Sequence, residues 1–229
     1  MKMAGRPAPG EPGLLLRAGL ALLLAAVAAG VGLALFAEPA APGLAAAVEA
    51  ELARSGADNP VTAVLLNFRG YDTLLEIAVL TAALVGVWAL GPAPRIKETM
   101  PSPVLLGMNS VLIPLGALIC VYLLWAGTAR PGGAFQAGAV LAAVSVLHIL
   151  SGRRPRMHLP EAPMRWGVVI GLAVFLAVGL GVKSAGGHFL EYPVDLAGGL
   201  ILFVETAATL SIAVILAGLF IGGRPEDEP

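Results

Sequence analysis

The stretch "LAGGLILFVETAATLSIAVILAGLFI", residues 196–221, decides the fold class of this chain. Within it, Glu205 is the only residue with a charged side chain. A helix of about 20 apolar residues crosses the hydrocarbon core of a bilayer. The stretch is apolar on all sides, whereas a strand of a membrane barrel alternates apolar with polar residues. It therefore predicts a membrane-spanning α-helix.

The composition of the whole chain agrees with a membrane environment. The chain has 229 residues, of which 58% are hydrophobic and 13% are charged, and its mean hydropathy is +0.87. A soluble domain carries about 25% charged residues. Five further runs are apolar and are as long as a spanning helix or nearly so: 14–36, 73–90, 104–126, 133–151 and 166–182. We therefore predict an all-α integral membrane protein with six transmembrane helices.

The distribution of Lys and Arg predicts how these helices are oriented. If the N-terminus lies in the cytoplasm, ten of the 14 basic residues fall on the cytoplasmic side, and four fall on the other side: Arg54, Arg69, Arg130 and Lys183. Cytoplasmic loops of membrane proteins carry an excess of Lys and Arg, so both the N- and the C-terminus are predicted to be cytoplasmic. The first run has 23 residues and exceeds the apolar core of a secretion signal, which has about 7–15. We interpret it as an anchor.

A group of charged residues lies where the second run begins, in "NFRGYDTLLE", residues 67–76. Arg69, Asp72 and Glu76 are spaced three and four residues apart, so they share one stripe of a helix. Gly70 allows the backbone to turn into that helix. Two interpretations stay open. The three side chains form ion pairs that hold a hinge between two helices, or the carboxylates help to move cations.

Glu205 lies about ten residues into the last run, near the middle of the bilayer. A charged residue at the centre of a spanning helix costs about 2.5–3.5 kcal/mol. Thr209 lies four residues further on and shares its face, which must therefore meet protein, water or a partner chain. A protonatable carboxyl in mid-membrane suggests a proton or sodium relay. The alternative is a neutral Glu205 that is hydrogen-bonded to a neighbouring backbone. No basic partner within the spans is obvious, which favours a partner on another subunit.

The segment "GTARPGGAF", residues 127–135, joins the third and fourth runs with almost no spare chain. Gly and Pro favour a sharp reversal of the backbone. We therefore predict a structural turn formed by Gly127, Pro131, Gly132, Gly133 and Phe135.

Residues that commonly hold cofactors or metals are scarce. The single cysteine, Cys120, lies inside an apolar run, and the three histidines are scattered. The sequence therefore predicts no cofactor, no metal site and no catalytic site. The net charge of −1 gives no reason to expect nucleic acid as a partner.

Two stretches resemble parts of a known family. "NPVTAVLLNFRGYDTLLEIAVLTAALVGVWAL", residues 59–90, resembles the segment that ends the large A subunit of Mrp-type multisubunit cation/proton antiporters and that stands alone as the E subunit of membrane-bound hydrogenases. The matching positions are Phe68, Arg69, Gly70, Tyr71, Asp72, Thr73 and Glu76.

From residue 102 onward, "SPVLLGMNSVLIPLGALICVYLLWAGTARPGGAFQAGAVLAA" resembles the MnhB (MrpB) subunit of the same antiporters. The turn in that family is usually Gly-His, two variable positions and Pro-Gly-Gly-Gly-Phe. Here Thr128 replaces the histidine and Ala134 the third glycine. The last helix of the family usually has Phe-Asp near its middle, whereas Val204 separates Phe203 from Glu205 in this chain.

The resemblance implies an E-like segment that is fused to a B-type subunit. We therefore expect an anchor helix and outer loop at 1–58, an E-like segment at 59–100 and an MnhB-like four-helix domain at 101–229. The resemblance further implies a small, non-catalytic subunit of a cation/proton antiporter in the bacterial inner membrane, with other subunits as partners and Na⁺ and H⁺ as ions. Asp72 and Glu76 would lie near an ion route between subunits. Two alternatives remain: a subunit of an ion-pumping, hydrogenase-like redox complex, and a structural scaffold with inert acids.

Overall fold

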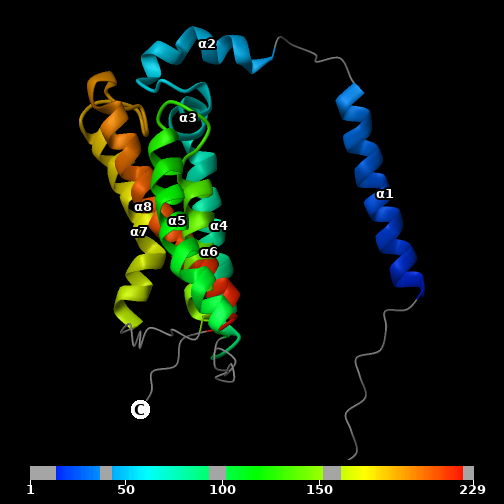
Figure 1. Ribbon diagram of the computed structural model, residues 1–229. Helices are drawn as coiled ribbons and strands as arrows, with labels where there is room; N and C mark the ends of the chain where they lie inside the picture. Colours follow the sequence, from blue (N-terminus) through cyan, green and yellow to red (C-terminus); the bar gives the residue numbers. More distant parts are fainter. Residues whose placement is uncertain (1–13, 37–42, 93–101, 152–160, 224–229) are drawn as a thin grey trace, which may run out of the picture. The chain divides into compact units, whose positions relative to one another are not determined.

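The chain was studied as a computed structural model, which describes residues 14–36, 43–92, 102–151 and 161–223. These residues form α-helices that are connected by turns, with one short π-helical segment, η1. The elements are α1 (Leu14–Phe36), α2 (Leu44–Ser55), α3 (Pro60–Ala63), η1 (Val64–Phe68), α4 (Gly70–Ala89), α5 (Pro103–Ala126), α6 (Ala134–Leu150), α7 (Glu161–Ser184) and α8 (Val194–Ile221) (Figure 1). The predicted all-α class is confirmed.

Among the residues that the structure describes, four helices are long and apolar enough to cross a membrane. They are α4, α5, α8 and the part of α7 from Pro163 to Ser184. Two shorter apolar segments are Ala18–Ala34 within α1 and Ala134–Leu150, which is α6. The structure thus supports four of the six predicted spans by length and composition, and six spans in total remain a prediction. The cytoplasmic position of both termini also remains a prediction. The termini lie outside the described residues, and so do most of the basic residues on which the prediction rests: Lys2, Arg6, Arg95, Lys97, Arg153, Arg154, Arg156 and Arg224.

The chain divides into two compact units, Met1–Leu44 and Ala45–Pro229. In the first unit, α1 is a single apolar helix whose described large side chains are exposed, for example Leu22, Leu33 and Val27. A helix that is apolar on all sides is suited to lipid. This helix fits the predicted anchor.

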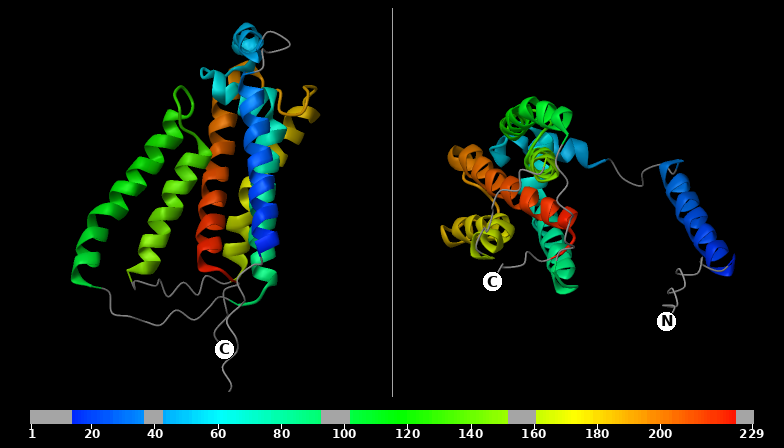
Figure 2. Two further views of the ribbon diagram at one scale, coloured as in Figure 1. Left: turned by 90° about the vertical axis from the view of Figure 1, so that its right-hand side faces the viewer. Right: turned by 60° about the horizontal axis from the view of Figure 1, so that its bottom comes forward.

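In the second unit, α8 is the central helix. It packs against α6, α7 and α4, and α5 packs against α6 (Figures 1 and 2). The contacts are close because small residues lie at the crossings. A Cβ atom added to Gly138 of α6 would lie 2.8 Å from Ile212, and one added to Gly171 of α7 would lie 2.7 Å from Ser211. Small residues of this kind allow membrane helices to approach closely. The core of the unit therefore lies along α8.

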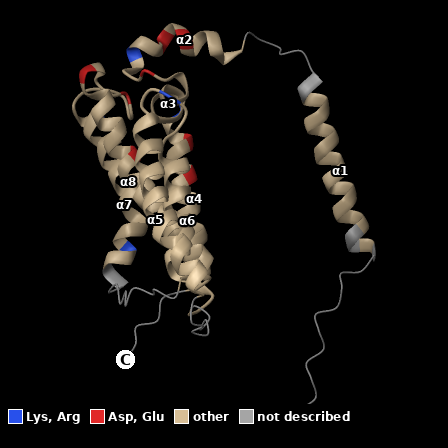
Figure 3. Ribbon diagram, in the orientation of Figure 1, with Lys and Arg blue, Asp and Glu red and all other residues tan. Residues whose placement is uncertain are grey.

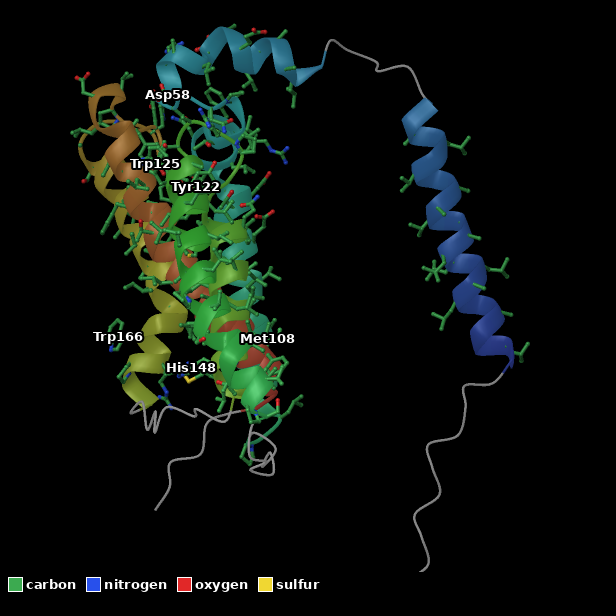
Figure 4. All side chains as sticks on the ribbon, in the orientation of Figure 1. Asp58, Met108, Tyr122, Trp125, His148 and Trp166 are labelled. Atoms are coloured by element: carbon green, nitrogen blue, oxygen red, sulfur yellow. The ribbon has the colours of Figure 1, made fainter. Side chains whose placement is uncertain are left out.

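Exposed aromatic residues lie towards the two ends of the second unit. Tyr122 and Trp125 lie towards one end of α5, and Trp166 lies towards the opposite end of the unit, on α7 (Figure 4). Trp125 and Trp166 are 68% and 70% exposed. Trp and Tyr are enriched at both membrane–water interfaces. The positions of these aromatic side chains are therefore compatible with the two membrane–water interfaces of a bilayer.

The connection that leads into α4 is fixed by polar contacts. Asn59 caps α3, where its side-chain oxygen accepts a hydrogen bond of 2.9 Å from the backbone N–H of Val61. The Thr73 hydroxyl donates to the Leu65 carbonyl oxygen at 2.7 Å, which ties the first turn of α4 back to η1. Gly70 begins α4 directly beside Leu190, whose Cδ1 would lie 2.6 Å from a Cβ atom at this position. The turn predicted at Gly70 is therefore also a close-packing point.

Candidate functional site

The turn between α5 and α6 is compact because its glycines approach other backbone atoms. A Cβ atom on Gly132 would lie 2.4 Å from the Leu123 carbonyl oxygen, and one on Gly127 would lie 2.6 Å from the Gly133 nitrogen. The Gly133 N–H donates to the Leu123 carbonyl oxygen at 3.0 Å. Gly133 itself has φ of 107°, a conformation that favours glycine, and it directly precedes α6. The predicted turn therefore reverses the chain sharply at the N-terminus of α6.

Glu205 of α8 meets this turn. Its side chain is 6% exposed, and the backbone N–H of Ala134, the first residue of α6, faces its carboxyl as a hydrogen-bond donor. A Cβ atom on Gly133 would lie 2.7 Å from Oε1 of Glu205. The first N–H groups of a helix lack partners within the helix and carry partial positive charge. The start of α6 thus offers this buried carboxyl a hydrogen-bond donor.

The second carboxyl oxygen of Glu205 is buried and has no hydrogen-bond partner among the described residues. It belongs to a side chain that lines a cavity of about 160 Å³. Besides Glu205, the polar lining residues are Asn59, Thr62, Thr73 and Gln136, and the turn contributes Pro131, Gly132, Gly133 and Phe135. A cavity of this size, with these polar groups in a mainly apolar wall, has room for several water molecules. The Glu205 side chain therefore lines a cavity that is large enough to hold water.

The cavity lies where the segment before α4 meets the turn. Thr62 of α3 is buried, and its hydroxyl donates to the Gly127 carbonyl oxygen at 2.7 Å. Phe175 and Val204 form apolar parts of the cavity wall. The cavity is thus built jointly by the stretch around residues 59–73, the turn and α8.

Thr209 lies on the buried face of α8, as the four-residue spacing predicts, but its hydroxyl serves its own helix. It donates to the backbone carbonyl oxygen of Glu205 at 2.8 Å. Thr209 does not line the cavity. The Thr209 hydroxyl thus donates to the backbone of Glu205 and not to its carboxyl.

Arg69, Asp72 and Glu76 are not among the residues that line the cavity. Arg69 and Asp72 form an ion pair, and their side chains are 62% and 47% exposed. Glu76 is exposed, and no ion pair within the described part of the chain includes it. Thr73, between Asp72 and Glu76, lines the cavity. The acidic positions on α4 are visible in Figure 3. The structure thus forms one of the predicted ion pairs and separates these three residues from Glu205.

Sequence reasoning did not identify several residues at this site. Asn59, Thr62 and Thr73 are ordinary polar residues near a helix start, and nothing in their spacing indicates that they meet the turn. The signal that could have found them is the short apolar stretch before residue 69, which has too few residues to cross a bilayer and so could have been expected to pack beside a turn between helices. Within the described residues, no group of three or more His, Cys, Asp or Glu residues could hold a metal ion.

Comparisons with protein families agree with the two resemblances. A domain described as related to the MnhB subunit of Na⁺/H⁺ antiporters matches residues 104–223, and the MbhE family, the E subunit of MBH, matches residues 17–101. A probable A/B subunit of a K⁺/H⁺ antiporter of Rhizobium meliloti is 30% identical over 59% of this chain and 16% of its own length. The A subunit of a Na⁺/H⁺ antiporter of Bacillus subtilis is 49% identical over 43 residues, which are 5% of its length. The uncharacterized protein MJ1307 of Methanocaldococcus jannaschii is 25% identical, with 59% of its length covered. This chain therefore spans only part of each of these relatives.

Two solved structures have the same fold. One is a chain of an archaeal respiratory complex, the membrane-bound sulfane sulfur reductase (MBS), with a TM-score of 0.72 and 26% identity, and the match covers 91% of this chain and 98% of that one. The other is a chain of the Mrp complex from Dietzia, with a TM-score of 0.67 and 22% identity over 97% of this chain and 28% of that one. Both belong to assemblies of several subunits, so other subunits are expected as partners. This chain is a multi-pass membrane protein of the family related to the MnhB subunit of Na⁺/H⁺ antiporters, with an MbhE domain ahead of its MnhB-related domain.

Proposed function

We propose that this chain is an accessory subunit of a multisubunit cation/proton antiporter and that its carboxyl groups line part of an ion pathway. The observation that carries the proposal is the carboxyl of Glu205. It is buried in a spanning helix and its side chain lines a cavity that has other polar groups in its wall; one of its oxygens faces the start of α6, and the other is buried without a partner among the described residues.

The alternative is a carboxyl that only caps α6. A cap requires one carboxyl oxygen, and a second oxygen that is left buried without a partner costs about 1–3 kcal/mol. Intramembrane acidic residues usually face a water-filled cavity and mark ion or proton routes. An oxygen that is free to bind a proton, a water molecule or a cation in turn is what such a route requires. The cavity and the free oxygen together favour a pathway over a cap alone.

Asp72 and Glu76 support a second part of the same proposal. Both lie on the outward face of α4, where Tyr71, Leu75 and Val79 are exposed apolar neighbours. A carboxylate on such a face is costly in lipid and becomes acceptable against water or a polar partner helix. We propose that this face adjoins another subunit and that Glu76 and Asp72 line the route where the two chains meet, with Arg69 paired to Asp72.

The relatives of this chain suggest in which membrane it acts and which ions are exchanged. Two of them are subunits of bacterial antiporters by name. We propose that the chain acts in the cell membrane of a bacterium, with Na⁺ or another monovalent cation exchanged for H⁺, without a cofactor of its own. We also propose a division into an anchor and outer loop at 1–58, an E-like segment at 59–100 and an MnhB-like domain at 101–229, although the MbhE match, at 17–101, extends over the anchor as well.

A second candidate function is a membrane subunit of an ion-pumping redox complex. The match to the MbhE family and the structural likeness to a chain of the MBS complex favour it. The proposed role of Glu205 would be the same there, but electron transfer would drive it. Co-purification of the intact assembly followed by mass spectrometry separates the two. Redox subunits with iron–sulfur or nickel centres would identify the respiratory complex, and large antiporter subunits without them would identify the antiporter.

The proposed pathway is tested by Glu205→Gln and Glu76→Gln in the assembled complex. Glutamine preserves the size of the side chain, but its amide carries no negative charge and does not take up a proton at physiological pH. Antiport is measured in inverted vesicles from an antiporter-deficient host as the collapse of a pH gradient on addition of Na⁺ or K⁺. We expect a loss of more than tenfold for Glu205→Gln and a smaller loss for Glu76→Gln. The matched control is Glu49→Gln on the exposed surface of α2, which should leave the rate unchanged. If both single variants and the double variant transport like the wild type, the chain is a scaffold.

A further inference from the structure

A second cavity, of about 250 Å³, opens on the surface of the protein where α5 ends. It is lined by the last turn of α5 and the residues that follow: Tyr122, Trp125, Ala126, Thr128, Ala129 and Arg130. None of these residues lines the Glu205 cavity. Tyr122 and Trp125, three residues apart, both lie near this end of α5 (Figure 4). The cavity is thus a separate feature at the end of a candidate spanning helix.

Backbone hydrogen bonds hold Arg130 beside this last turn of α5. The Arg130 N–H donates to the Ala126 carbonyl oxygen at 2.7 Å, and the Ala129 N–H donates to the same oxygen at 3.1 Å. The Thr128 hydroxyl donates to the Trp125 carbonyl oxygen at 2.9 Å. The chain therefore winds on from the helix, and the basic residue stays close to the aromatic one.

The guanidinium group of Arg130 has no counter-ion within the described part of the chain. It is exposed, and no ion pair or hydrogen bond joins it to a described residue. By contrast, Arg54 and Arg69 are paired with Glu51 and Asp72. A guanidinium group binds a phosphate group well, because two of its N–H groups can donate in parallel to two phosphate oxygens. Arg130 thus offers the cavity an unpaired donor for an anion.

An exposed apolar stripe on α5 leads away from this cavity. Its residues follow one another at intervals of three and four, which places them on one face of the helix. They are between 47% and 68% exposed: Val111, Leu115, Leu118, Tyr122 and Trp125. The ten residues from Leu115 to Trp125 span ~15 Å of helix, which is half the thickness of a hydrocarbon core of ~30 Å. This α5 stripe can therefore extend through one leaflet of a bilayer.

We propose that the cavity binds the phosphate group of a phospholipid through Arg130 and that the acyl chains of this lipid lie along the α5 stripe. The charges are complementary, and Trp and Tyr are suited to the level of the headgroups. Of the candidate spans in the described residues, α5 has the smallest buried share, 11%, which leaves its face open to lipid. A free phosphate ion would use Arg130 but would leave the stripe without a partner. This site does not depend on the proposed ion pathway, so either can fail without the other.

The site is tested in the purified complex, reconstituted into vesicles with a small fraction of a phosphatidylglycerol that carries a diazirine in its acyl chain. Illumination attaches the lipid to the residues that its chain contacts, and mass spectrometry locates them. We expect label on the α5 stripe. A diacylglycerol with the same diazirine but no phosphate should label the stripe about tenfold less, as for the loss of one hydrogen bond to a charged group. Equal labelling by the two probes would show that only bulk lipid meets the stripe and would overturn the site. A stripe without label would mean that another subunit covers this face, which would also overturn it.

Arg130→Gln tests the residue that is proposed to hold the phosphate group. The side chain is exposed, so the complex should assemble normally, and we expect labelling by the phosphatidylglycerol probe to fall about tenfold. Lys183→Gln is the matched control, because Lys183 is an exposed basic residue in the last turn of α7 that lines neither cavity. It should leave the labelling unchanged. Wild-type labelling in Arg130→Gln would overturn the role of Arg130. An equal fall in both variants would indicate a general effect of surface charge and would overturn the site.

Discussion

Gly133 and Glu205 lie against each other although they are far apart in the chain: a Cβ atom on Gly133 would lie 2.7 Å from Oε1 of Glu205. This contact joins the turn between α5 and α6 to the middle of α8. Two physical reasons therefore favour glycine at position 133: the backbone has a positive φ, and the Glu205 carboxyl occupies the space that a side chain would need. The turn is therefore part of the environment of Glu205 as well as a connection between two helices.

The first prediction concerns Gly133→Ala. The new methyl group would contact Oε1, and the backbone conformation at φ of 107° is costly for any residue with a Cβ atom. We expect the variant complex to lose about 1–3 kcal/mol of stability and to lose most of its antiport. Thermal inactivation of the purified complex and transport in vesicles measure the two effects.

Gly181→Ala is the matched control for this prediction. Gly181 lies inside α7, and a Cβ atom there would meet no atom within 4 Å. Alanine is the better helix former by about 1 kcal/mol. The control should be neutral or slightly stabilised. Equal behaviour of the two variants would show that the turn does not need a glycine beside Glu205.

The second prediction concerns Thr62→Val, which removes the buried hydroxyl that binds the Gly127 carbonyl oxygen at 2.7 Å. Valine has the same shape, so the loss is that of one hydrogen bond with its acceptor left buried, about 1–3 kcal/mol. We expect a lower inactivation temperature of the complex. Thr206→Val is the control, because the Thr206 hydroxyl is exposed and bonds only to Leu202 of its own helix. Indistinguishable inactivation temperatures for the two variants would argue against Thr62 as a tie between α3 and the turn.

The third prediction concerns Leu190→Ala. The side chain of Leu190 fills the space between Gly70 and Gly179, and its removal leaves a cavity. Removal of a buried leucine side chain costs about 2–5 kcal/mol. We expect earlier thermal inactivation and faster proteolysis of the segment around residues 185–193. Leu44→Ala, at an exposed position of α2, should show neither effect. Unchanged proteolysis in Leu190→Ala would mean that this side chain does not hold the segment.

The long helices could be predicted from the sequence because hydropathy over about 20 residues reports directly on the solvent that a helix meets. The run around Glu205 and the run at 73–90, which correspond to α8 and α4, are examples. The partner of Glu205 could not be predicted, because an all-apolar helix gives no periodic pattern that indicates which neighbour it faces. The four-residue spacing placed Thr209 on the correct face, but spacing cannot tell that its hydroxyl bonds to its own backbone. Likewise, Arg69, Asp72 and Glu76 share a stripe, and only packing shows that Thr73 rather than this stripe faces the cavity.

The most direct test of the central claim is whether a cation competes for the Glu205 carboxyl. Dicyclohexylcarbodiimide reacts with protonated carboxyl groups in apolar surroundings, and mass spectrometry of the complex identifies the labelled residue. If Glu205 lies on the ion pathway, it should be labelled, and Na⁺ or K⁺ should slow the labelling several-fold while choline at the same ionic strength does not. Labelling of Glu205 at one rate in Na⁺, K⁺ and choline, with antiport intact after it is labelled, would contradict the account.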